Sequence, residues 1–98
     1  MTIEIKRNAD ETIIELAGRL DTTTAPALDK TINGDIEGTK NLVLNFKHLE
    51  YISSAGLRVL LSAQKKLQSI GTMKVTNVCE AVMEVFDMTG FTDILVIE

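Results

Sequence analysis

The sequence has few of the residues that build disulfide-linked or metal-bound scaffolds. Its 98 residues include one cysteine, Cys79, one histidine, His48, and no tryptophan. A single cysteine excludes an internal disulfide, and one cysteine with one histidine cannot supply the ligands of a structural zinc site. The sequence also has no glycine-rich phosphate loop of the nucleotide-binding kinds. We therefore expect a domain with no cofactor and no metal.

Long apolar runs and an excess of positive charge are also missing. No apolar run approaches the ~18 residues of a membrane-spanning helix, and the N-terminus has no signal-peptide core, so we expect a cytoplasmic protein without membrane insertion. Ten Lys and Arg residues stand against 14 Asp and Glu residues, giving a net charge of −4. Because no basic stripe is available to neutralise phosphates, direct binding to nucleic acid is not expected. Another protein is the expected partner.

The composition is that of one ordinary globular domain. Hydrophobic residues make up 45% of the chain and charged residues 24%. A chain of this length can bury roughly 60 to 70% of its unfolded surface, which is enough for one core. Residues 1–98 are therefore expected to form a single domain.

Hydrophobic periodicity predicts an α/β fold. Strands are expected at 2–6, 12–18, 42–46, 73–76 and 93–97, and helices at 22–32, 54–70 and 80–88. The first two strands are close enough for an antiparallel hairpin, whereas a strand, helix and strand at 42–76 imply a parallel crossover. We expect a mixed sheet of about four to five strands with three to four helices, mainly packed on one face.

Two adjacent serines lie at the boundary between the strand at 42–46 with its loop and the central helix. Ser53 and Ser54 are both placed to cap the helix, and Gly56 leaves its first turn slim enough for another backbone to approach. A hydroxyl at the positive end of the helix dipole would also accommodate a phosphate. From the residues alone, either serine can be a structural cap or a switch.

A catalytic serine is not expected. The hydrolase nucleophile elbow needs glycine two residues before the serine, where this chain has Tyr51 and Ile52. His48 is too close along the chain to be a convincing triad base. We therefore do not expect an enzyme.

Three segments carry a resemblance to a known family. The stretch 49–60, Leu-Glu-Tyr-Ile-Ser-Ser-Ala-Gly-Leu-Arg-Val-Leu, resembles the signature of STAS domains, specifically the bacterial anti-sigma factor antagonists, whose usual core is Asp-Ser-(Ser or Thr)-Gly-Leu. The segment 18–25 resembles the family's Gly-x-Leu-Asp segment, and 85–91 is similar to its Leu-Phe-Asp-Met-(Ser or Thr)-Gly stretch. Together they span nearly the whole chain in the right order, so the resemblance implies a single STAS domain.

The resemblance also implies site residues. Matched on Gly56, Ser54 falls on the serine that is phosphorylated in the family, and Ser53 is the less favoured alternative. Two positions depart from the pattern. Ser53 stands where the family usually has aspartate, and Ala55 stands where it often has a second hydroxyl residue. The implied partner-binding residues are Asp21, Thr22, Ser53, Ser54, Ala55, Gly56, Leu57 and Arg58. For Asp21, simple turn chemistry is an equally weighted alternative.

The implied function is that of an anti-sigma factor antagonist. The unphosphorylated domain would bind an anti-sigma factor that is also a serine kinase, and so release its sigma factor. Phosphorylation of Ser54 would switch it off, and a serine phosphatase would reset it. The alternative is a STAS adaptor or regulatory subunit of a transport or stress-signalling complex that is never phosphorylated. The oligomeric state stays open: a free strand edge could mediate self-association, and locating one requires the strand order.

Overall fold

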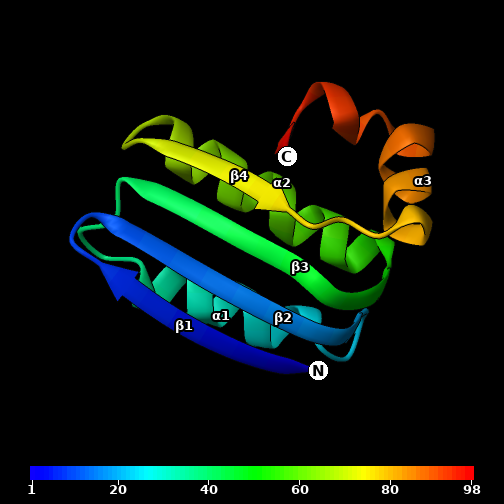
Figure 1. Ribbon diagram of the computed structural model, residues 1–98, viewed down its shortest axis with the longest axis horizontal. Coiled ribbons are helices and arrows are strands. Elements are labelled where there is room, and N and C mark those ends of the chain that lie inside the picture. Colours follow the sequence, from blue (N-terminus) through cyan, green and yellow to red (C-terminus); the bar gives the residue numbers. More distant parts are fainter.

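Five strands form one mixed sheet in the order in which they occur along the chain (Figure 1). The computed structural model describes residues 1–98 apart from the side chain of Asp35. The elements are β1 (Thr2–Asn8), β2 (Glu11–Leu20), α1 (Ala25–Asp35), β3 (Asn41–Ile52), α2 (Ser54–Gln68), β4 (Thr72–Thr76), α3 (Glu80–Thr89), the 3-10 helix η1 (Phe91–Asp93) and β5 (Val96–Ile97). β1 and β2 pair antiparallel, and the other three pairs are parallel. The predicted α/β fold is confirmed.

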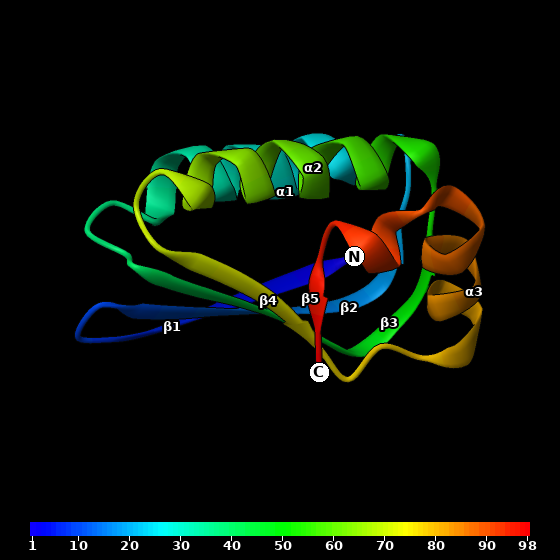
Figure 2. The ribbon, with the colours of Figure 1, turned by 90° about the horizontal axis from the view of Figure 1, so that it is seen from above.

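The helices are distributed unevenly around the sheet. Figure 2 shows α1 and α2 side by side over one face, with α3 at one end of the sheet. The core lies between the sheet and these two helices. Alternating residues of the strands, among them Ile14, Leu44 and Phe46, are fully buried there, as the period of two along a strand requires. Leu60 and Leu67 of α2 cover them at helical spacing.

Two strands are longer than predicted, and both extensions lead to the same edge of the sheet. β3 was expected to end at residue 46, but it continues through the predicted loop to Ile52. Leu49 and Ile52 are each 2% exposed, so burial of these side chains keeps the segment extended. β2 likewise runs past the predicted end at residue 18 to Leu20, with irregular register around Gly18.

The first helix and the last strand also differ from prediction. α1 was expected to stop at Asn33-Gly34 but includes both residues. Ile32 and Ile36, four residues apart, are 2% and 3% exposed, and their burial outweighs the cost of about 1 kcal/mol for a helical glycine. At the other end, the predicted strand 93–97 is reduced to Val96–Ile97.

Candidate functional site

The parallel pairing of β2 with β3 brings two loops together. Leu20 and Ile52 are register partners at the ends of these strands, and Asp21 and Ser53 follow them directly. The backbone N–H of Ser53 donates to the carbonyl of Leu20 at 2.9 Å. The loops that enter α1 and α2 therefore start side by side, which joins two segments that are distant in sequence.

The two adjacent serines have different environments. Ser53 occupies the N-cap position of α2, yet its hydroxyl makes no capping bond, and its Oγ is buried without a hydrogen-bond partner among the described residues. Ser53 therefore contributes to the first turn of α2 through its backbone: its carbonyl accepts a hydrogen bond from the Leu57 N–H at 3.0 Å. Ser54 is the first residue of α2 and is exposed to solvent. The predicted capping by a serine side chain is thus wrong.

Two predicted binding residues lie beneath the surface. Gly56 is buried, and a Cβ there would lie 2.7 Å from Cγ of Leu20 and 2.8 Å from Cγ1 of Ile52. Leu57 is 7% exposed. The first turn of α2 therefore packs on side chains at the ends of β2 and β3, and not against another backbone as predicted. This close packing fixes where Ser54 lies.

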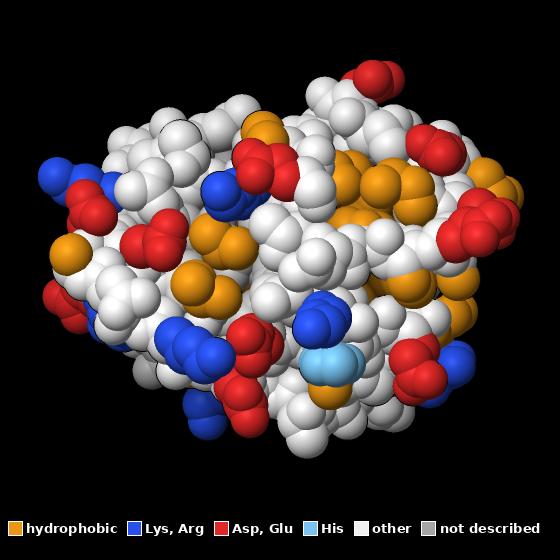
Figure 3. Space-filling view, viewed as in Figure 1, with side chains coloured by type: hydrophobic (Ala, Val, Ile, Leu, Met, Phe, Trp, Pro, Cys, Tyr) orange, Lys and Arg blue, Asp and Glu red, His pale blue; other side chains and the backbone are white. Residues whose placement is uncertain are grey.

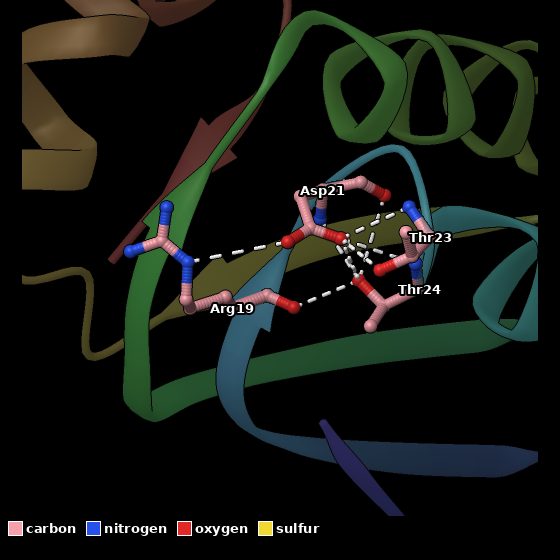
Figure 4. A network of polar contacts seen from close by, with 4 residues as sticks. All are labelled: Arg19, Asp21, Thr23 and Thr24. Carbon is pink, nitrogen blue, oxygen red and sulfur yellow. Dashed lines mark hydrogen bonds and ion pairs between the residues drawn. The ribbon is translucent and has the colours of Figure 1, made fainter.

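A carboxylate organises the loop before α1 (Figure 4). Oδ1 of Asp21 accepts hydrogen bonds from the Thr23 hydroxyl at 2.8 Å and the Thr23 N–H at 3.0 Å, and from the Thr24 N–H at 3.2 Å. Oδ2 lies 4.0 Å from Nε of Arg19. Thr24 occupies the N-cap position of α1 without a side-chain capping bond, and its hydroxyl donates to the Arg19 carbonyl at 2.7 Å. Asp21 is therefore the side-chain acceptor for the backbone N–H groups in the loop before α1.

These donors also set the charge of the loop. The side-chain hydrogen bond from Thr23 is the largest cause that lowers the pKa of Asp21 below its ordinary value of 3.8, opposed by partial burial and helped by the Thr23 and Thr24 backbone donors. Asp21 is consequently anionic at neutral pH, in one fixed orientation. It presents a permanent negative charge beside the start of α1.

Two exposed residues next to this loop were not predicted. The guanidinium carbon of Arg19 lies 4.1 Å from the centre of the Tyr51 ring, within the range of a cation–π contact. Arg19 and Tyr51 are register partners across β2 and β3. The two residues are 32 positions apart in the sequence, and no local pattern predicts their contact. It becomes visible only once the pairing of the two strands is known.

A shallow, open groove of about 360 Å³ lies between α1 and α2. It is lined by Thr22, Ala25, Pro26, Asp29, Ala55, Arg58 and Val59. Thr22, Ala55 and Arg58 were among the predicted binding residues, whereas the α1 residues and Val59 were not. The periodicity of each helix is visible in the sequence, but the relative rotation of two packed helices is set by the core beneath them.

The described residues of the site form an accessible, charged surface, and no catalytic arrangement of side chains is found among them. His48 is exposed in β3, and no hydrogen bond among the described residues joins it to Ser53 or Ser54. Within the same described part of the chain, no three His, Cys, Asp or Glu side chains are grouped to hold a metal ion. None of the described helices is long and apolar enough to cross a membrane. What the site presents is an exposed hydroxyl, a fixed carboxylate and a groove.

Comparison with known proteins places this arrangement in a family. The sequence model of the STAS domain matches residues 2–98. The anti-sigma F factor antagonist of Paenibacillus polymyxa is 30% identical over 98 residues, which cover 97% of this chain and 84% of that relative.

Solved structures share the fold. An anti-sigma factor antagonist from Mycobacterium paratuberculosis superposes with a TM-score of 0.88 at 23% identity, covering 98% of this chain and 83% of that one. The Bacillus cell fate determinant SpoIIAA, solved in its phosphorylated form, gives a TM-score of 0.77 at 19% identity, covering 99% of this chain and 91% of that one. With the family match over nearly its whole length, this chain belongs to the STAS domain family, among the anti-sigma factor antagonists.

Proposed function

We propose that the domain is a protein-binding switch controlled at Ser54. In the unphosphorylated form it binds an anti-sigma factor that is also a serine kinase, and the sigma factor held by that kinase is released. The kinase then transfers phosphate from Mg-ATP to the Ser54 hydroxyl, the complex dissociates, and a serine phosphatase restores the binding form. These partners act in the cytoplasm, so the domain is expected there.

The observation that carries the proposal is the different exposure of the two serines. Ser54 is exposed at the head of α2, next to the groove residue Ala55, whereas Oγ of Ser53 is buried. A kinase must reach the hydroxyl that it modifies, so Ser54 is the available acceptor and Ser53 would require the first turn to open. Among proteins of this fold, SpoIIAA has been solved in a phosphorylated form, which supports the proposal.

The proposed switch acts at the interface and leaves the fold intact. A phosphate adds about −1.5 to −2 charges at neutral pH, and the positive end of the helix dipole tolerates it. Ser54 is already exposed to solvent, so a phosphate on its hydroxyl stays hydrated in the free domain. In a closed complex the same dianion must lose water next to the partner, close to the permanent charge of Asp21. A loss of about 1.4 kcal/mol already weakens binding tenfold.

The proposed docking surface combines the loop and the groove. Asp21, Thr22, Ser54, Ala55 and Arg58 are its accessible members among the residues expected from the sequence. The buried members of that set act from beneath, by holding the first turn of α2 against the sheet. The exposed faces of α1 and α2 that line the groove extend the surface beyond the expected residues.

Substitutions on α2 test the proposal. Ser54→Ala should keep binding to the anti-sigma factor and abolish phosphorylation, whereas Ser54→Asp should weaken binding about tenfold or more. Gln68 is an exposed residue in the last turn of the same helix, so Gln68→Glu is a matched control that adds one negative charge roughly 21 Å along the helix from Ser54 and should bind normally. Calorimetric titration with the anti-sigma factor measures the affinities. Undiminished phosphate incorporation into the Ser54→Ala variant would place the acceptor elsewhere.

The second candidate is an adaptor that is never phosphorylated. It is favoured by Ser53, which stands where the family usually has aspartate and so removes a negative charge beside the acceptor. Such an adaptor would copurify with a transporter ATPase or a large signalling complex, and its Ser54→Asp variant would bind as the original does.

A further inference from the structure

The outermost strand of the sheet has an unpaired edge. β1 forms one border of the sheet (Figure 1), and six of its seven residues are exposed. A strand in this position presents a row of unpaired N–H and C=O groups that another strand can use. The opposite border is formed by β5, which has only two residues. If either border takes part in association, β1 is the one with the length to do so.

The side chains of β1 are complementary to those of a second β1. In an antiparallel pair with Ile5 opposite Ile5, Glu4 of each copy faces Lys6 of the other. Ile3 then faces the aliphatic stem of Arg7. Opposite charges at facing positions stabilise a strand pair. Because the pairing is symmetric, the two glutamates and two lysines form two equivalent ion pairs around one two-fold axis.

Among the described residues of one copy, Glu4 forms no ion pair. Glu4 is the register partner of Glu15 on β2, and like charges at facing positions repel. Nζ of Lys6 lies 3.3 Å from Oε1 of Glu15, so this lysine is engaged with the second of the two acids. Figure 3 shows acidic and basic side chains gathered along the border where β1 runs. Lys6 of a second copy would supply the missing cation opposite Glu4.

The centre of the strand carries an apolar side chain that the fold leaves partly uncovered. Ile5 is 39% exposed, although its register partner Ile14 is fully buried. Two Ile5 side chains on a two-fold axis would cover each other and remove apolar surface from water.

We propose that two copies of this chain associate through antiparallel pairing of their β1 strands, with Ile5 at the two-fold axis. The pairing joins the two sheets into one continuous sheet and is isologous, so it closes at the dimer. Ile14 precedes Leu20 by six positions on β2, which is roughly 20 Å along a strand. The proposed contact therefore leaves the groove and Ser54 free in both copies, and it stands or falls independently of the phosphorylation switch.

Charge exchange between strands tests the register. In analytical ultracentrifugation the unaltered chain should show a reversible monomer–dimer equilibrium. Glu4→Lys and Lys6→Glu should each weaken dimerisation by about tenfold or more, because each change places like charges opposite one another twice. An equimolar mixture of these two variants should recover dimers, since the two lysines of one strand then face the two glutamates of the other. The variant with both substitutions should also recover them.

Lys65→Glu is the matched control, because it makes the same charge change at an exposed position of α2. It should dimerise like the unaltered chain, and circular dichroism should show the same fold for every variant. A chain that stays monomeric at millimolar concentration overturns the proposal. So does a mixture of the two single variants that associates no more strongly than either alone.

Discussion

At the scale of single residues, the two adjacent serines of the site have different environments. Ser53 and Ser54 are identical in the sequence, yet one hydroxyl is buried and the other residue is exposed. Ser53 has extended backbone angles of −101° and 177°, whereas Ser54 is already helical. The change of backbone conformation between them therefore decides which of the two serines is exposed to solvent.

The hydrogen bonds to Asp21 predict a measurable pKa. Thr23→Val removes the hydroxyl donor, so the pKa of Asp21 should rise towards 3.8. Because the folded-state pKa is lowered, the stabilisation is present above the ordinary value of 3.8 and is lost as pH falls through the folded value. The variant should lose less stability in this acidic window. An NMR titration of the Asp21 carboxyl carbon measures the pKa.

Thr22→Val is the control for this titration, since the same hydroxyl is removed from the neighbouring position and no hydrogen bond joins Thr22 to Asp21 among the described residues. An unchanged pKa in the Thr23→Val variant would show that the loop donors do not hold the carboxylate.

At the scale of elements, the sequence predicts which segments are strands and helices better than where they end. The apolar run at 42–46 predicts β3, but the extension of this strand to Ile52 depends on the burial of Leu49 and Ile52 in the core. The same holds for α1, which continues through Asn33-Gly34 because Ile36 is buried. Local signals identify an element, whereas contacts with distant residues set its length.

The candidate site divides in the same way. The resemblance to a family motif makes Ser54 and Asp21 candidates, because each motif is a short continuous segment that can be read from the sequence. The groove residues on α1 and the contact of Arg19 with Tyr51 were missed, because they arise from packing between helices and from register between strands. No local pattern encodes either relation.

Two glycines, one in a helix and one in a loop, should respond oppositely to the same substitution. A Cβ at Gly71, which follows α2, would lie 1.7 Å from the carbonyl oxygen of Lys40, so Gly71→Ala should cost about 3 kcal/mol or more. Gly34 lies in α1, and a Cβ added there would have no atom within 4 Å apart from its chain neighbours and the backbone of its own helix. Gly34→Ala should therefore stabilise the domain by about 0.5–1 kcal/mol. Urea unfolding measures both, and a shift in the same direction would contradict the assigned contacts.

At the scale of the whole molecule, the fold separates the hydrophobic core from the proposed docking surface. The core lies between the sheet and the pair α1 and α2, while the proposed docking surface is formed where these helices begin (Figure 2). Ser54 contributes to that surface without being part of the core. A charge added to Ser54 should therefore change what the domain binds and leave its fold unchanged.

The central claim is tested most directly by intact mass of the domain incubated with Mg-ATP and its anti-sigma kinase, followed by peptide mapping of residues 47–65. We expect one phosphate, located on Ser54, with loss of the complex as it accumulates and an unfolding temperature close to that of the unmodified domain. A stable complex that never acquires phosphate while the kinase is active on another substrate would contradict the switch, and so would a single phosphate on Ser53.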